Sequence, residues 1–302
     1  MRINALQKRK TMFDSQTIAT RHGAVRYSDT GGSGFPVLLI HGSSFSRRVF
    51  ERQFNSELAR HWRLIALDLP GHGESDNAPQ PNVTYTVSGF ADCLEEFAER
   101  LDLKRLAVYG WSLGGHAAIE WMSRSTRIRG LMLSGAPPIS RGIIGMLRAF
   151  HPSFDLLLTT KHSFTARDAA RFSSLCFGGQ EPAPFQDLVL RTDGLVRSNF
   201  GQSLARGDGA DQRRTVEGAT IPIALLNGAD DPFVRLGYLS GIHIPHQYGD
   251  EPTIVIGAGH APFWERPDLF NPALDHFVEA VAAETASAWQ AHVHRVTARA
   301  RA

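Results

Sequence analysis

The sequence is poor in cysteine, in net charge and in long apolar runs. Two cysteines, Cys93 and Cys176, occur in 302 residues, so a disulfide framework is not indicated and we expect two separate reduced thiols. The formal net charge of +2 argues against nucleic acid as a partner. No apolar run is long enough to span a membrane, and no apolar signal segment follows the basic residues 1–10. We therefore predict a cytoplasmic protein without membrane insertion.

Metal-ligand motifs are also scarce. His292 and His294 form a close pair, but no third ligand accompanies them. We therefore predict no metal and no cofactor, and a chain that is a monomer or a weak homodimer.

What the sequence does contain is an alternation of apolar runs and amphipathic segments. A hairpin is predicted over 17–29, and further strands over 36–40, 63–68, 105–109, 130–134, 221–226 and 253–256. Helices are predicted over 87–103, 115–122 and 267–282. The alternation favours an α/β domain with a mostly parallel sheet that helices cover on both faces.

Residues 137–215 interrupt this alternation. Short amphipathic pieces at 143–150, 166–176 and 185–196 follow one another without strands between them. We interpret the interruption as a helical cap inserted after the sixth strand. The predicted organisation is a core at 16–136 and 216–285, a cap at 137–215 and flexible termini at 1–15 and 286–302.

The segment 110–114 reads Gly-Trp-Ser-Leu-Gly and lies between a predicted strand and a predicted helix. A G-x-S-x-G match alone is a weak signal, because glycine and serine are common. The strand–turn–helix context is the physical requirement of a nucleophile elbow, in which a strained turn exposes the serine hydroxyl. Ser112 is therefore the predicted nucleophile, and it needs a base to accept its proton.

Candidates for the base and for its orienting acid follow in the chain. His260 lies in a glycine-flanked loop after the strand at 253–256, and we predict that it is the base. Asp230 and Asp231 are adjacent after the strand at 221–226, where a carboxylate often only caps a helix. Asp231 is favoured because it lies three residues after the turn residue Gly228. The order serine, acid, histidine differs from that of trypsin-like and subtilisin-like proteases.

Acyl transfer also needs hydrogen-bond donors for the oxyanion of the transition state. The backbone N–H of Leu113 follows the nucleophile, and that of Ser43 follows the His41-Gly42 pair; a plain glycine turn is the alternative for the latter. Four aromatic residues are candidate walls of a substrate site, although such residues often belong to the core: Trp111, Phe172, Phe233 and Phe263.

With these motifs the chain resembles the α/β-hydrolase superfamily and, within it, the metal-independent N-acyl homoserine lactone hydrolases, the quorum-quenching lactonases. The resemblance extends over residues 17–280 and is dense at 68–73, 110–116, 129–132, 135–138, 191–194 and 259–263. It implies an α/β-hydrolase fold with an eight-stranded sheet, and a catalytic triad of Ser112, His260 and Asp231.

Three positions depart from the pattern of that family. Ser43 stands where the family has asparagine, Asp231 where it has glutamate, and Phe172 aligns with a cap tyrosine that helps to hold the lactone. A phenylalanine lacks the hydroxyl that donates that hydrogen bond.

The resemblance implies a serine hydrolase that cleaves a small carboxylic ester or lactone, with ring opening of N-acyl homoserine lactones through an acyl-enzyme as the main expectation. Other functions stay open: a general short-chain carboxylesterase, a carbon–carbon bond hydrolase, a perhydrolase, or a ligand receptor on the same fold.

Overall fold

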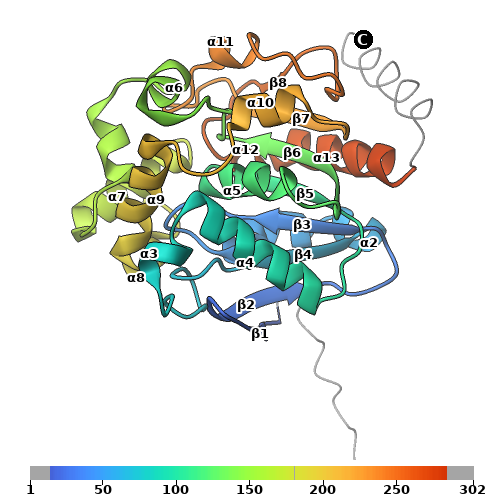
Figure 1. Ribbon diagram of the computed structural model, residues 1–302, viewed down its shortest axis with the longest axis horizontal. Coiled ribbons are helices and arrows are strands. Elements are labelled where there is room, and N and C mark those ends of the chain that lie inside the picture. The colour runs from blue at the N-terminus through green and yellow to red at the C-terminus, as the bar shows by residue number, and fades with distance from the viewer. Residues whose placement is uncertain (1–13, 180, 284–302) are drawn as a thin grey trace, which may run out of the picture.

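The central element of the computed structural model is a twisted sheet (Figure 1). The structure describes residues 14–179 and 181–283. Residues 1–13 and 284–302, which include most of both predicted termini together with His292 and His294, lie outside the described residues. The strands of the sheet are β1 (Gln16–Thr20), β2 (Gly23–Asp29), β3 (Pro36–Ile40), β4 (Arg63–Leu67), β5 (Leu106–Trp111), β6 (Ile128–Ser134), β7 (Ile223–Gly228) and β8 (Thr253–Val255).

In the described part of the chain the sheet has eight strands in the order β1-β2-β4-β3-β5-β6-β7-β8. The β1–β2 and β2–β4 pairs are antiparallel, and the pairs from β4 through β3, β5, β6 and β7 to β8 are parallel. The fold class predicted from the sequence is therefore confirmed.

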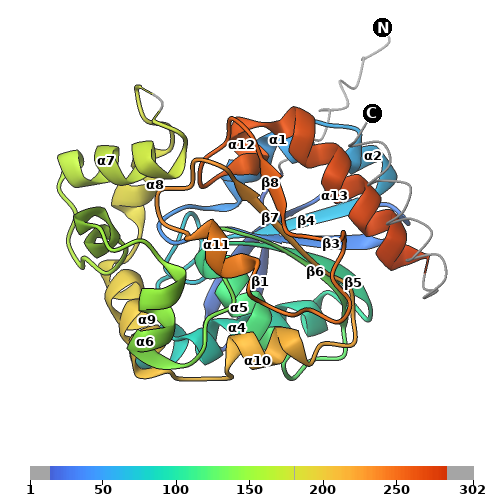
Figure 2. The ribbon, with the colours of Figure 1, turned by 90° about the horizontal axis from the view of Figure 1, so that it is seen from above.

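Helices cover both faces of the sheet. Figure 2 shows α1 (Glu51–Phe54), α2 (Leu58–His61), α12 (Pro262–Glu265) and α13 (Pro267–Ala282) on one face, and α4 (Val87–Arg100), α5 (Leu113–Met122) and α10 (Gln212–Glu217) on the other. Other short elements are η1 (Arg47–Phe50), α3 (Pro81–Thr84) and α11 (Leu236–Leu239).

The two faces of the sheet carry separate hydrophobic clusters, because successive strand side chains point in opposite directions. On β3, Leu38 and Ile40 belong to the cluster that packs on α4 and α5, whereas Val37 and Leu39 belong to the cluster that packs on α13. All four side chains are fully buried. A strand covered on both faces is a continuous apolar run, which is the pattern that the sequence shows at 36–40.

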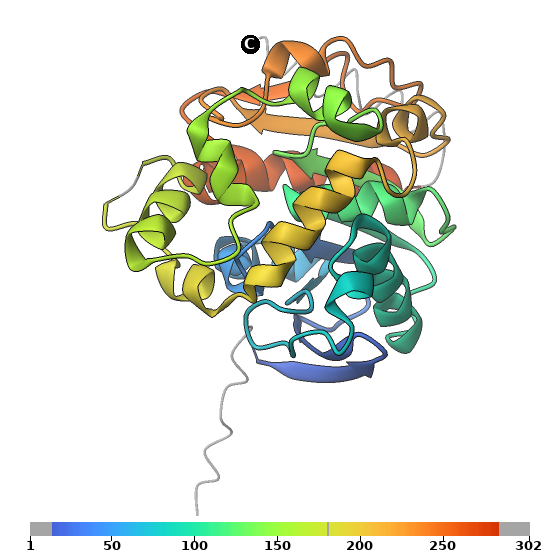
Figure 3. The ribbon, with the colours of Figure 1, turned by 60° about the vertical axis from the view of Figure 1, so that its left-hand side comes forward.

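A group of helices lies across one end of the sheet, between β6 and β7 in the chain. It consists of α6 (Gly142–Ala149), η2 (Phe154–Thr159), α7 (Ala166–Cys176), α8 (Gln186–Arg191) and α9 (Gly194–Arg206). Figure 3 shows these elements in front of the sheet, and we call them the cap helices.

One predicted helical piece, 185–196, is two helices in the structure. The α8 helix ends at Arg191, and the side chain of Asp193 accepts the backbone N–H of Leu195 at 3.0 Å, which caps the start of α9. The α9 helix continues to Arg206 and ends at Gly207, whose φ of 76° is left-handed. The prediction at 185–196 is wrong because Asp193 starts a new helix instead of lying inside one.

A buried ion pair holds the loop that follows β4. The carboxylate of Asp68 accepts the backbone N–H groups of Arg47 at 2.7 Å and Glu74 at 2.9 Å, and it pairs with the Arg47 guanidinium. Asp68 is fully buried and Arg47 nearly so. Burial raises the pKa of Asp68, and the charge of Arg47 opposes that rise.

We expect the Asp68→Ala variant to lose about 3–5 kcal/mol of the free energy of unfolding, because it removes the main partner of a buried guanidinium. Urea denaturation measures the loss. Glu57→Ala is the control, since it breaks the exposed pair between Glu57 and Arg60 and leaves the midpoint nearly unchanged. Equal midpoints for the two variants would contradict the assignment.

Candidate active site

Ser112 occupies a sharp turn between β5 and α5. Its φ of 54° and ψ of −121° are strained for a residue with a side chain. The flanking glycines permit the turn: a Cβ on Gly110 would lie 2.6 Å from the Cα of Gly115, and a Cβ on Gly114 would lie 2.5 Å from the carbonyl oxygen of His41. The structure therefore has the strand–turn–helix geometry that the motif requires.

His260 and Asp231, which are 29 residues apart in the chain, form a buried pair. The Nδ1 of His260 lies 2.8 Å from the Oδ2 of Asp231. The second carboxylate oxygen of Asp231 accepts the backbone N–H groups of Phe233 at 2.8 Å and Val234 at 3.1 Å. A carboxylate only accepts hydrogen bonds, so Nδ1 of His260 carries the proton and Nε2 is left as the basic nitrogen.

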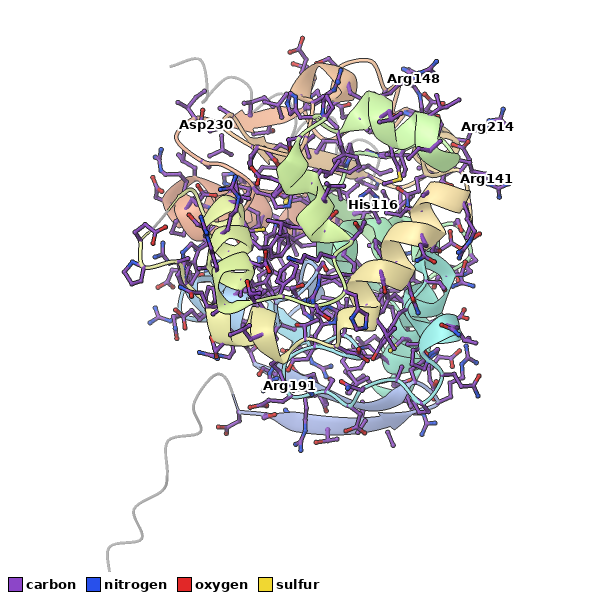
Figure 4. All side chains as sticks on the ribbon, turned by 90° about the vertical axis from the view of Figure 1, so that its left-hand side faces the viewer. His116, Arg141, Arg148, Arg191, Arg214 and Asp230 are labelled. Carbon is purple, nitrogen blue, oxygen red and sulfur yellow. The ribbon has the colours of Figure 1, made fainter. Side chains whose placement is uncertain are left out.

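Asp230 takes no part in this pair. It is exposed, its backbone N–H donates to the carbonyl of Ala258, and Figure 4 shows it at the outer edge of the molecule. Of the two adjacent carboxylates, the geometry brings Asp231 to the imidazole.

His260 is held through its backbone and through its ring. The indole N–H of Trp111 donates to the backbone carbonyl of His260 at 2.8 Å, and the ring of Phe233 meets the imidazole edge-on at 4.8 Å. Gly135, with φ 64°, lies against the same ring: a Cβ there would lie 2.4 Å from the Cε1 of His260. These contacts orient the imidazole before any ligand arrives.

Glu265 fixes the loop that carries His260. Its carboxylate accepts the backbone N–H groups of Gly259 at 2.9 Å and Ala261 at 3.0 Å, on either side of the histidine. Burial raises the pKa of Glu265 while these two bonds lower it. The sequence analysis did not single out Glu265, although a carboxylate five residues after a catalytic-type histidine could have drawn attention to it.

In the loop after β3, hydrogen bonds fix the orientation of the peptide group between Gly42 and Ser43. The carbonyl oxygen of Gly42 lies 2.8 Å from Nδ1 of His41 and accepts the N–H of Phe45 at 3.3 Å. Nε2 of His41 accepts the N–H of Leu69 at 3.0 Å, so Nδ1 of His41 is the donor to Gly42. Because the C=O and N–H of a trans peptide point in opposite directions, the N–H of Ser43 points away from His41.

This loop passes directly beside Ser112. A Cβ on Gly42 would lie 3.1 Å from the Cβ of Ser112. Leu113 is the first residue of α5, where the backbone N–H has no partner inside its helix. Ser43 and Leu113 therefore flank Ser112, as an oxyanion site requires.

An apolar cavity opens at Ser112 and His260. Together with the solvent space at its mouth it encloses about 730 Å³. Ser43, Ser112, Leu113 and His260 all line it, and most of the other lining residues are apolar. The wall residues include Phe45, Trp111, Met146, Phe150, Leu156, Phe172, Cys176, Phe200, Leu204 and Phe233.

The four predicted aromatic wall residues divide into two groups. Trp111, Phe172 and Phe233 line the cavity. Phe263 is fully buried and does not line it; its ring packs 5.0 Å from Trp111 and 5.1 Å from Phe50, in the core between the sheet and α13. The sequence placed Phe263 near the site because it lies close to His260 in the chain, whereas its side chain points into the core.

His116 is a cavity residue that the sequence analysis did not select. It lies one helical turn after Ser112 on α5, lines the cavity and is almost fully buried beneath the cap helices (Figure 4). Its Nδ1 lies 2.8 Å from Oε1 of Gln212, and burial lowers the pKa of His116 to about 4. The i, i+4 spacing from the nucleophile was the signal that could have revealed it.

Both cysteines are free, as predicted, and both are buried. Within residues 14–179 and 181–283, no group of three or more His, Cys, Asp or Glu side chains is arranged to hold a metal ion. No helix in the same ranges has the length and apolar character that a membrane span needs.

Families and curated proteins that are similar to this chain include hydrolases. A model of the alpha/beta hydrolase family matches residues 37–273. The chain is 31% identical to the AB hydrolase superfamily protein YisY of Bacillus subtilis, over 86% of this chain and 97% of that protein. It is 29% identical to the pimeloyl-[acyl-carrier protein] methyl ester esterase of Xanthomonas axonopodis pv. citri, over 84% of this chain and 98% of the esterase.

Among solved structures, the chain is similar to the N-acyl homoserine lactonase AidH. A mutant of AidH in complex with N-hexanoyl homoserine lactone matches with a TM-score of 0.86 and 35% identity, over 89% of this chain and 98% of that one. AidH in complex with N-butanoyl homoserine matches with a TM-score of 0.85 and 36% identity, over 89% of this chain and 97% of that one.

The site predicts how a serine-directed probe reacts. We expect a fluorophosphonate to label Ser112 and the Ser112→Ala variant to stay unlabelled, with labelling followed by mass spectrometry. Asp231→Asn lowers the labelling rate by about 10³-fold or more, because the carboxylate no longer sets the tautomer of His260. Asp230→Asn is the matched control and labels at the wild-type rate. Equal loss in the two aspartate variants would contradict the pairing of His260 with Asp231.

The buried histidines predict a loss of stability in acid. Burial lowers the pKa of His41 and of His116 to about 4, whereas an unfolded imidazole titrates near about 6.5. Between these values the unfolded chain binds protons that the native chain does not, so stability is full above about pH 6.5 and falls as the pH drops toward 4. Each such imidazole then lowers the free energy of unfolding by up to about 1.4 kcal/mol per pH unit.

Urea midpoints measured near neutral pH and in mild acid, at about pH 7 and about pH 5, test this expectation. The wild type loses stability on acidification, and His116→Gln, which lacks one of these imidazoles, loses less. An identical loss in the variant would show that His116 becomes protonated in the folded protein as readily as in the unfolded chain.

Proposed function

The chain belongs to the alpha/beta hydrolase family, and from that membership we propose that it is a serine hydrolase that opens the ring of N-acyl homoserine lactones. The observation that carries the proposal is the coincidence of an elbow serine and a buried His–Asp pair on one apolar cavity. Identities of 35% and 36% to a lactonase over nearly its whole length support the choice of a lactone as the substrate.

In the first half of the reaction, Oγ of Ser112 attacks the lactone carbonyl carbon while Nε2 of His260 takes the hydroxyl proton. Asp231 stabilises the imidazolium that forms and stays ionised. The backbone N–H groups of Ser43 and Leu113 donate to the oxyanion. The ring C–O bond then breaks, and His260 returns the proton to the leaving alkoxide.

The leaving group of a lactone remains attached to the acyl group, so the intermediate is a hydroxyacyl ester of Ser112. In the second half, His260 takes a proton from water, and the hydroxide attacks the ester carbonyl. The C–O bond to Ser112 breaks, the serine regains its proton, and the N-acyl homoserine leaves. One water is consumed in each turnover.

The cavity fits an acyl chain better than a polar group. The ring of Phe172 stacks on that of Phe45 at 5.8 Å and presents an apolar face next to Ser43 and Ser112. Burial of the acyl methylenes against such walls contributes about 0.8 kcal/mol for each CH₂. Affinity therefore depends on acyl length more than on a hydrogen bond from the cap.

A second candidate is hydrolysis of an open-chain carboxylic ester. The specific observation in its favour is the 29% identity to a methyl ester esterase over 98% of that enzyme. The same residues would act in the same order, and the alcohol would leave the site after the first half of the reaction.

Ring opening of acyl homoserine lactones decides between the two. We expect the purified protein to open lactones with acyl chains of several lengths, followed by proton release in weak buffer and by mass spectrometry of the product. Ser112→Ala lowers the rate by a factor of about 10⁴ or more. Ester turnover on p-nitrophenyl substrates without ring opening would replace the lactonase proposal with an ester hydrolase.

A further inference from the structure

A guanidinium lies buried behind the loop that carries Ser43. Arg197, on the cap helix α9, is 2% exposed. It donates from Nε to the carbonyl of Lys161 at 2.7 Å, from Nη2 to the carbonyl of His162 at 2.7 Å, and from Nη1 to Oγ of Ser44 at 3.0 Å. The ring of Phe164 lies against the guanidinium at 4.1 Å.

All of these hydrogen-bond acceptors are neutral. Among residues 14–179 and 181–283, no carboxylate forms an ion pair with Arg197. The nearby carboxylate of Asp193 accepts the hydroxyl of Tyr85 at 3.0 Å and the N–H of Leu195 at 3.0 Å instead. Burial lowers the pKa of Arg197 to about 10, so it stays charged near neutral pH. Burying a charge that forms no ion pair costs free energy. We therefore expect the position of Arg197 to have a structural or functional reason.

Ser44 is the residue of the loop after β3 that the guanidinium of Arg197 contacts. Ser44 follows Ser43 directly, is fully buried and has a φ of 70°, a left-handed conformation that strains a residue with a side chain. Its hydroxyl accepts the bond from Arg197. The other end of the same loop is fixed at Gly42 by His41 and Phe45. The peptide of Ser43 is therefore anchored on both sides.

Arg197 also connects this loop to the cap. The carbonyls of Lys161 and His162 belong to the segment between η2 and α7, which continues from the cavity-lining residues Thr159 and Thr160. Phe164 packs on Phe172, a cavity wall, at 5.7 Å. One side chain thus joins the cap wall of the cavity to the loop beside the nucleophile.

We propose that Arg197 is a positioning residue of the hydrolase, which holds Ser44 in its strained conformation so that the N–H of Ser43 is aimed at the oxyanion. The inference rests on the proposed function, because it concerns the same site. It assigns a role to a cap residue that touches no substrate and acts through Ser44.

Variants of both partners test the proposal. Arg197→Gln removes the charge and Ser44→Ala removes the acceptor; each lowers kcat for p-nitrophenyl acetate by about 10–100-fold, with KM changed by less than about 3-fold. The acetyl group carries a single methyl, so a loss of acyl-chain binding contributes little to this result. Arg197→Lys keeps the charge and recovers part of the loss.

The double variant distinguishes a positioning role of Arg197 from a general disturbance of the folded structure. If Arg197 acts through Ser44, the combination of Arg197→Gln with Ser44→Ala is no slower than the slower single variant. Arg206→Gln is the matched control on the same helix, since Arg206 forms an exposed pair with Asp208, and it keeps the wild-type kcat. Thermal unfolding shows whether each variant is folded, and Ser44→Ala decides the matter if Arg197→Gln does not fold.

Two results would overturn the proposal. One is a kcat within about 2-fold of wild type in folded Ser44→Ala, and the other is fully additive losses in the double variant. The labelling rate of Ser112 by a fluorophosphonate gives a second readout, because the attack on phosphorus also develops negative charge on oxygen. A wild type that labels at Ser112 but turns over neither lactone nor ester would refute the proposed function, and the labelling rates of the variants would still decide the role of Arg197.

Discussion

The hydrogen bond between His260 and Asp231 is the interaction on which the proposed role of Ser112 as a nucleophile depends. It sets the tautomer of the imidazole and thereby leaves one basic nitrogen for the serine. The bond exists because the loops after β7 and β8 touch: a Cβ on Gly228 would lie 2.0 Å from the carbonyl oxygen of Gly259. Parallel neighbours in the sheet end at the same edge, so the two loops meet there although they are distant in the chain.

The surroundings of this pair are closely packed and mostly apolar. Phe233 and Gly135 lie against the imidazole, Trp111 donates to the backbone carbonyl of His260, and Glu265 holds the loop on either side of it. A site that is oriented before the ligand binds needs little reorganisation in the transition state, which is the main source of electrostatic catalysis. The apolar walls lower the local dielectric constant, and this strengthens each hydrogen bond that the backbone offers there.

Much of the architecture could be predicted, because local patterns report local structure. The runs at 36–40 and 166–176 and the helix at 267–282 coincide with β3, α7 and α13. Periodicity was misleading at 185–196, where a cap at Asp193 divides two helices. For Phe263, proximity to His260 in the chain did not indicate which way its ring points.

The amino-acid order alone indicates which helices and strands form and in what succession, because these follow from apolar periodicity. It also indicates the turn at Ser112, because that turn needs glycines at a fixed spacing. The folded arrangement was needed to tell which of two adjacent aspartates meets the imidazole and which aromatic rings face the cavity. The same is true of the contact between Arg197 and Ser44, which are 153 residues apart. Side-chain direction and long-range contacts depend on how strands and cap pack together, and no local pattern in the chain records that packing.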